Sequence, residues 1–286
     1  MTICIGVLAA DAKAIVCIAD RYISYGIEIL GETDSVKIVP IGENGTHVLI
    51  SGNDDATSRI LAKLSLRDDL GLKREQTKVS CENAYRESEE EVLEMRFLHP
   101  FLSRKEYKEA LSKERVNQVV RSIAEEIRKD RETQSQPTFG CNVLLCGFDD
   151  KKQPYLIKLG GHGICTDATL TGFCAIGSGS GYALQRLLSM EWKRKYPIDR
   201  ALFEMFDAKV QAENDINVGY DWDAVILTAD KPVLVSEEIK TMIDRAWIKL
   251  NRSPYESFNP DEHVPLPPDD WMTKLKAFAD TILDTP

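Results

Sequence analysis

The sequence lacks the features of a membrane protein or a nucleic-acid-binding protein. None of its apolar stretches reaches the roughly 18 residues of a membrane-spanning helix. Acidic residues outnumber basic ones, 46 against 36, and the formal net charge is −10, whereas binding to phosphate backbones needs a basic face. No basic segment precedes the first apolar run, which Asp11 and Lys13 interrupt, so no signal peptide is predicted. We therefore expect a cytoplasmic protein with no nucleic-acid or membrane partner.

Motifs for metal, nucleotide and serine chemistry are also missing. The four histidines are scattered, and no HExxH pattern is present. A glycine-rich run at 177–181 follows a predicted strand and opens a predicted helix, but Tyr182 replaces the last glycine of the dinucleotide fingerprint and no Walker lysine follows. No GxSxG nucleophile elbow occurs. We expect neither a metal nor a cofactor.

The seven cysteines form no convincing disulfide framework. Their number is odd, and most of them lie within apolar strand patterns, which is typical of small buried hydrophobic residues in a reducing compartment. Cys141 and Cys146 are five residues apart on one predicted strand. Successive side chains of a strand point to opposite faces, so these two cysteines are expected on different sides of their sheet.

Apolar residues make up 43% of the 286 residues, enough for one large domain. The chain begins with two predicted hairpins, one from 2–9 and 13–19 and the other from 36–41 and 47–51. A helix is predicted to start at Asn53. The later predicted elements, in chain order, are a charged helical region at 66–135, strands at 140–148, 155–160 and about 171–176, helices at 182–194 and 198–213, a strand at 223–229, and helices at about 236–250 and 271–284.

This order of elements predicts the fold class. Runs of strands alternate with runs of helices, and no internal repeat is visible, so single βαβ units are not indicated. Two sheets packed face to face, each covered on its outside by helices, satisfy this order. The prediction is an α+β protein with a four-layer αββα sandwich.

The first two residues suggest a catalytic group. Threonine is small enough for the preceding methionine to be removed, which would leave Thr2 with a free amine beside its hydroxyl. An α-amine has a pKa of about 7.7–8.0, so it serves as a base near neutral pH. Nucleophile and base then come from one residue. If Met1 is retained, Thr2 has no free amine and this hypothesis fails.

Several motifs, taken in order, resemble the proteasome β-subunit family of the N-terminal-nucleophile (Ntn) hydrolases. They are a threonine-initiated strand, Ala19-Asp20-Arg21, the strand from Val36 to Ile41, Ser51-Gly52 before a helix, GCNVLLCGFDD and AIGSGSGYAL. The resemblance covers about 2–60 and 138–228, is poor over 66–135 and is absent beyond about 232. It implies a proteasome-like domain at 1–232 with an enlarged helical region at 66–135, followed by a C-terminal extension at 233–286.

The resemblance also implies a catalytic site and an activity. The family's nucleophile, acidic partner, lysine, oxyanion-binding amide, and serine and aspartate near the amine fall on Thr2, Asp20, Lys37, Gly52, Ser178 and Asp215. The implied activity is hydrolysis of peptides or other amides by a threonine-type enzyme that forms a homo-oligomer. Two alternatives stay open: a non-catalytic subunit with an assembly or binding role, and a hydrolase of small amides. Cys4, on the same strand face as Thr2, is the rival nucleophile.

Three features depart from the family pattern. Val218 stands where the family has a serine three residues after its aspartate, which bears on proton transfer around the amine. Asn53-Asp54-Asp55 replaces small residues after the oxyanion glycine, which predicts either an acidic specificity pocket or a helix cap. The helical region at 66–135 is longer than the family's helices, and its apolar residues Phe97, Leu98 and Phe101 are predicted to lie on helical surfaces used for assembly.

Overall fold

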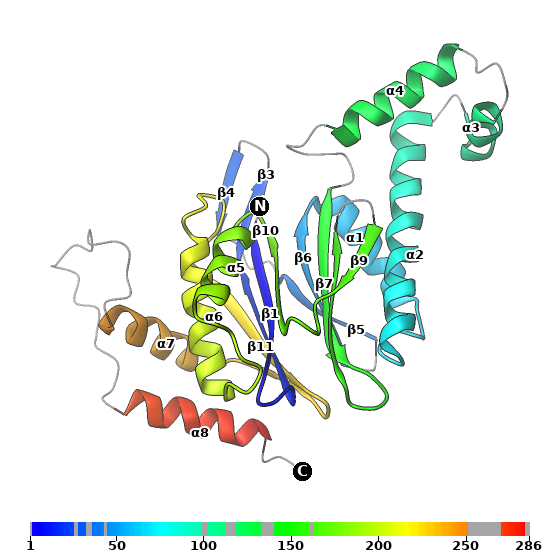
Figure 1. Ribbon diagram of the computed structural model, residues 1–286. Coiled ribbons are helices and arrows are strands. Elements are labelled where there is room, and N and C mark those ends of the chain that lie inside the picture. Colours follow the sequence, from blue (N-terminus) through cyan, green and yellow to red (C-terminus); the bar gives the residue numbers. More distant parts are fainter. Residues whose placement is uncertain are drawn as a thin grey trace.

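The chain folds into two antiparallel five-stranded sheets that pack face to face between outer layers of helices (Figure 1). This arrangement confirms the predicted α+β sandwich with αββα layers. The computed structural model describes residues 2–25, 28–32, 36–42, 45–98, 102–112, 118–132, 140–160, 163–250 and 270–283.

The first sheet has the strand order β10-β1-β2-β11-β12. Its strands are β1 (Ile3–Ala9), β2 (Ala14–Asp20), β10 (Phe173–Gly177), β11 (Trp222–Thr228) and β12 (Pro232–Leu234). β1 and β2 form the predicted N-terminal hairpin, and every residue of both strands is buried. Strands covered on both faces are expected to be continuously apolar rather than alternating, and these are so up to Asp20 at the end of β2.

The second sheet has the order β5-β6-β7-β8-β9. Its strands are β5 (Ile38–Ile41), β6 (Thr46–Gly52), β7 (Cys141–Phe148), β8 (Pro154–Gly160) and β9 (Ile164–Asp167). Cys141 faces the outer helices and Cys146 faces the layer between the sheets, as the strand periodicity predicted. A separate two-stranded sheet, β3 (Tyr22–Tyr25) and β4 (Glu28–Glu32), follows β2. β3, β4, β9 and β12 were not predicted.

The helices α1 (Asp54–Ser65) and α2 (Arg74–Leu93) cover the outer face of the second sheet. Asn53 begins α1 as predicted, because its side chain accepts the N–H of Ala56 at 3.1 Å. α2 continues into a π-helical turn, η1 (Glu94–Leu98). Beyond it, α3 (Arg104–Leu111) and α4 (Gln118–Glu132) project from the sandwich (Figure 1). The break predicted at His99-Pro100 lies outside the described residues.

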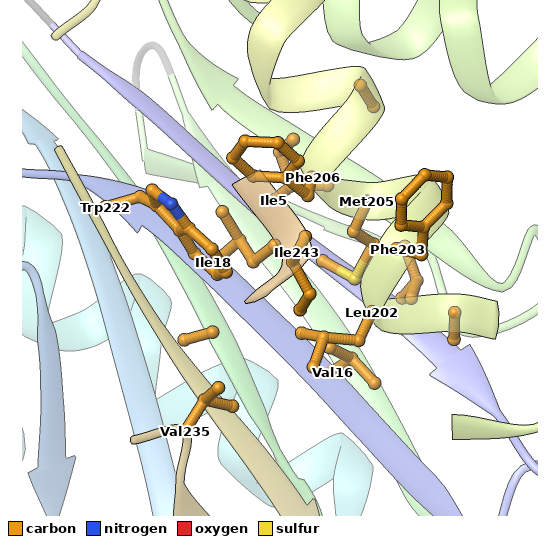
Figure 2. Packing of buried hydrophobic residues seen from close by; sticks show 14 of the residues in the cluster. Ile5, Val16, Ile18, Leu202, Phe203, Met205, Phe206, Trp222, Val235 and Ile243 are labelled. Carbon is orange, nitrogen blue, oxygen red and sulfur yellow. The ribbon is translucent and has the colours of Figure 1, made fainter. Parts of the chain in front are cut away.

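Four helices cover the outer face of the first sheet, namely α5 (Ser180–Ser189), α6 (Ile198–Ala212), α7 (Glu237–Lys249) and α8 (Trp271–Leu283). Figure 2 shows Ile5, Val16 and Ile18 of the sheet beneath Met205 and Phe206 of α6. Burying each such side chain stabilises the fold by about 1.5–3 kcal/mol. α7 and α8 belong to this core, so the segment after residue 232 packs onto the sandwich; most of the predicted tail at 253–270 lies outside the described residues.

The end of α5 differs from the sequence prediction, which continued that helix to residue 194. Glu191 adopts a φ of +50°, in the left-handed region. The N–H of Trp192 bonds to the carbonyl of Leu187 at 3.1 Å, and the N–H of Glu191 bonds to that of Leu188 at 3.0 Å. These two bonds form a Schellman motif, which ends a helix by satisfying its last carbonyls. The prediction was wrong here because the motif lacks its usual glycine.

Within the part of the chain that the structure describes, no helix is both long enough and apolar enough to cross a membrane.

Candidate active site

Thr2 lies at the start of β1 and is 3% exposed. The residues that follow on the same face of β1, Cys4 and Leu8, lie in the layer between the two sheets. The hydroxyl of Thr2 donates a hydrogen bond to Asp20 Oδ1 and accepts one from Lys37 Nζ. The structure thus brings together three residues that the sequence predicted as nucleophile, acid and lysine.

Asp20 ends β2 and is 1% exposed. Its Oδ1 atom also accepts the backbone N–H of Ile3 at 3.0 Å and the ammonium of Lys37 at 2.8 Å. Its Oδ2 atom accepts the backbone N–H of Gly219 at 3.0 Å. A buried carboxylate is tolerated only when its oxygens are paired with donors, and here both oxygens are. The carboxylate is therefore held in one orientation beside Thr2.

Lys37 lies just before β5, and its ammonium has three acceptors around it. They are the hydroxyl of Thr2, the carboxylate of Asp20 and the backbone carbonyl of Tyr22. An ammonium has three donors and no acceptor, so this arrangement uses all of them. The carbonyl of Lys37 accepts the N–H of Ile50 at 3.2 Å, which ties the lysine to β6.

Ser178 and Asp215 form a second pair next to this group. The carboxylate of Asp215 accepts the N–H of Asn217 at 3.0 Å, the side-chain amide of Asn217 at 2.8 Å and the hydroxyl of Ser178. Burial raises the pKa of Asp215, but these hydrogen bonds outweigh it, so the net pKa is below the ordinary value. Gly177, immediately before Ser178, has a φ of +102°, and a Cβ there would overlap the carbonyl of Thr2. The end of β10 therefore places Ser178 close to Thr2.

The turn after α6 connects the Ser178–Asp215 pair with the group formed by Thr2, Asp20 and Lys37. Asp215 lies on it, and Gly219, four residues later, donates to Asp20. Between them, Val218 is 6% exposed, and a Cβ added to Gly179 would lie 2.7 Å from its Cγ2. The residue that replaces the family serine therefore packs as part of the apolar core. Sequence reasoning missed Gly219 because no motif marks a backbone amide 199 residues from its acceptor.

Gly52 ends β6 at the same end of the sandwich as Lys37, because Ile50, two residues earlier, is paired with Lys37. Its φ is +116°, and a Cβ there would overlap the carbonyl of Gly140. This position therefore requires glycine. The structure describes the conformation of Gly52, while its role as the oxyanion donor stays a prediction.

The rival nucleophile Cys4 has different surroundings. Its thiol is fully buried and donates to the carbonyl of Ile50 at 3.3 Å. Burial raises the pKa of Cys4 far above its ordinary value, although the positive charge of Lys37 opposes the shift. Because the thiolate is the reactive form, Cys4 is a poor nucleophile at neutral pH.

The residues after Gly52 form the predicted helix cap, while the predicted acidic pocket stays a prediction. Asn53 caps α1, and both carboxylate oxygens of Asp55 lie 3.1 Å from Nε of Arg59. The side chain of Asp54 lies outside the described residues. A surface hollow of about 350 Å³ next to this turn is lined by Asn53, Asp55, Arg59, Val92, Met95 and Arg96. Its charge is therefore not purely acidic.

Comparisons with known proteins bear on the fold of this chain. A family model described as "Proteasome subunit" matches residues 96–208, a range that includes part of the helical region in which the motifs showed little resemblance. The solved structure of Anbu (ancestral beta-subunit) from Yersinia bercovieri is similar, with a TM-score of 0.53 and 16% identity over 90% of this chain and 98% of that chain. No curated protein sequence matches. The chain has a proteasome-like fold, and its resemblance to the proteasome β-subunit-like Ntn hydrolases is confirmed.

Proposed function

We propose that this chain is a threonine-type amidohydrolase, a proteasome-like peptidase, whose nucleophile is Thr2 after cleavage of the Met1–Thr2 peptide bond. One observation carries the proposal. The hydroxyl of Thr2 lies between the carboxylate of Asp20 and the ammonium of Lys37, and all three side chains are buried. Two buried charges around one hydroxyl favour a reactive oxygen over a merely structural one.

In the proposed first step, Thr2 Oγ1 attacks the carbonyl carbon of the substrate amide, and the hydroxyl proton passes to the free α-amine of Thr2. The ammonium of Lys37 favours the negative oxygen that develops on Thr2, and Asp20 holds the ammonium in place at 2.8 Å. The ordinary pKa of an α-amine, about 7.7–8.0, leaves a fraction of this group unprotonated near neutral pH.

The tetrahedral intermediate then carries a negative oxygen, which the backbone N–H of Gly52 is proposed to bind. A donor fixed before the reaction stabilises this charge without reorganising. As the C–N bond breaks, the protonated amine of Thr2 gives its proton to the leaving nitrogen. The resulting ester between Thr2 and the acyl group is hydrolysed by water, which restores the hydroxyl. Ser178 and Asp215 are proposed to orient the α-amine from their position beside Thr2.

A non-catalytic subunit is the second candidate, and Val218 is the observation that favours it. An apolar, 6% exposed side chain occupies the position of the family serine, so one polar partner for the amine is missing. If this loss prevents catalysis, Val218→Ser restores activity that the wild-type protein lacks, whereas Val218→Ala does not.

An electrophilic peptide probe, together with the intact mass of protein purified from its host, tests the proposal. We expect a chain that begins at Thr2 and carries the label on that residue. Label on Cys4 would reject the threonine mechanism. A retained Met1 without any label would favour the non-catalytic subunit.

We also propose a homo-oligomer in the cytoplasm. Of the apolar residues predicted for assembly, Leu98 is 3% exposed and belongs to the fold itself, Phe97 is half-buried, and Phe101 lies outside the described residues. Met95 on η1 and Val119 on α4 are apolar side chains with 62% and 56% of their surface exposed, and we propose that they contribute to the assembly surface. Sedimentation at micromolar concentration should give a mass above one chain; a monomer would favour the small-amide hydrolase instead.

A further inference from the structure

The five residues 219–223 lie beside the catalytic end of β2 and lead into β11, which pairs with β2 in the first sheet. Besides the bond from Gly219 to Asp20, the N–H of Arg21 bonds to the carbonyl of Asp221 at 3.0 Å. The guanidinium of Arg21 bonds to both carboxylate oxygens of Asp223, at 2.9 and 2.5 Å. The orientation of Asp20 therefore depends on the position of this segment.

Two buried lysines from different helices bond to the backbone carbonyls of the same segment. Lys209 of α6 has a fully buried side chain, and its ammonium bonds to the carbonyl of Tyr220 and, at 2.5 Å, to Glu213. Lys240 of α7 is 5% exposed and donates to the carbonyl of Trp222 at 2.8 Å. The Lys240 ammonium also has two carboxylate partners, Asp223 at 3.4 Å and Glu237 at 2.5 Å.

Packing alone does not require a lysine at either position. Lys209 follows Met205 by one helical turn, and Lys240 precedes Ile243 and Trp247 at helical spacing, so both occupy the apolar stripes of their helices. Burying an ammonium is costly even when it is paired, and apolar residues of similar size often replace buried ion pairs without loss of stability. What the lysines add is a fixed position for the carbonyls of residues 220 and 222.

We propose that Lys209 and Lys240 are positioning residues for the Thr2 site. They hold residues 219–223 in place, and this segment presents the N–H of Gly219 to Asp20, which bonds to Thr2 and Lys37. The inference rests on the proposed function, and it assigns a role to α7, which lies in the C-terminal segment beyond the motifs of the resemblance. Neither lysine touches Thr2, so substitution should lower kcat and leave KM unchanged.

The test compares Lys209→Met and Lys240→Met with Lys63→Met in peptide hydrolysis. Lys63 is a suitable control because it is also a helical lysine with a carboxylate partner, Glu91 at 2.6 Å, but it lies on the opposite face of the sandwich. Each variant is assayed well below its own unfolding midpoint. We expect kcat to fall on the order of tenfold for the first two variants with KM within twofold, no change for the control, and partial recovery in Lys240→Arg. Wild-type kcat in both Met variants would overturn the inference.

If the wild-type protein neither hydrolyses peptides nor is labelled at Thr2, the proposed function itself fails. A second measurement then tests the role of the two lysines without an activity assay. Unfolding is then measured for Lys240→Met, Asp20→Asn and the double variant. If residues 219–223 transmit the position of Lys240 to Asp20, the effects on the unfolding midpoint are not additive, because coupled residues share an interaction. Additive effects would overturn the inference.

Discussion

Two neighbouring regions of the layer between the sheets differ sharply in their chemistry. At Thr2 the layer is ionic, with the carboxylate of Asp20 and the ammonium of Lys37 both bonded to one hydroxyl. Two residues further along β1, Cys4 lies in an apolar cluster that also contains Cys146. Lys37 acts on both regions, yet burial dominates at Cys4 and raises its thiol pKa. The comparison teaches that burial keeps the thiol of Cys4 in its less reactive protonated form, while the hydroxyl of Thr2 has two charged partners.

The largest expected effect comes from removing the nucleophile. Thr2→Ala should lower the rate of amide hydrolysis at least about a thousandfold, because no other group can form the acyl intermediate. Stability and assembly should change little, since Ile3, Ile5 and Val7 keep the strand in the core. Steady-state kinetics and circular dichroism measure the two effects. Thr2→Ser is the control, and it should keep activity; hydrolysis by Thr2→Ala at the wild-type rate would refute the mechanism.

The next largest effect is expected from removing the ammonium of Lys37, which acts on both regions. Lys37→Met should lower hydrolysis about a hundredfold, because the developing negative oxygen loses its ammonium. It should also destabilise the protein by about 3 kcal/mol, because the carboxylate of Asp20, which is 1% exposed, loses its buried charge partner. Denaturant unfolding measures the second effect. A fully active Lys37→Met protein would show that the ionic region is structural only.

A small effect is expected from the apolar side of the comparison. Cys4→Ala removes one buried sulfur and should cost about 1 kcal/mol in unfolding free energy. The rate of hydrolysis should stay within about threefold of wild type, because Cys4 takes no part in the proposed reaction. If activity and probe labelling disappear together in this variant while Thr2→Ala keeps both, the assignment of the two regions is reversed.

The smallest effect concerns the pH dependence of stability at Asp215. Its pKa in the folded protein is below the ordinary value of 3.8, so the carboxylate stabilises the fold above that value and loses this contribution as pH falls through the folded pKa. Asp215→Asn should therefore cost less than about 1 kcal/mol at pH 7, since the group is partly exposed to solvent. The difference from wild type should shrink as pH falls from 7 to below 3.8. An equal difference over this whole range would exclude an ionic origin.

Local patterns predicted most of the sandwich. Continuous apolar runs indicated β1 and β2. Asn53 indicated the start of α1 and Pro197 the start of α6, because both residue types commonly begin a helix. β3, β4, β9 and β12 escaped prediction because strands of three to five residues have little periodicity to read, although β5 and β10, which are as short, were predicted. The C-terminal helices were located correctly, but their packing onto α6 required the tertiary structure.

For the site, the sequence by itself determined which residues to consider: Thr2, Asp20 and Lys37 follow a recognisable order of motifs. Only the tertiary structure decided how they are oriented. The bond from Gly219 to Asp20 joins residues 199 positions apart, and no local spacing records such a contact. The sequence patterns did not single out Lys209 or Lys240, and the carbonyls that they hold became known only from the fold. Long-range hydrogen bonds are set when distant segments pack together, which is why a pattern of neighbours along the chain cannot specify them.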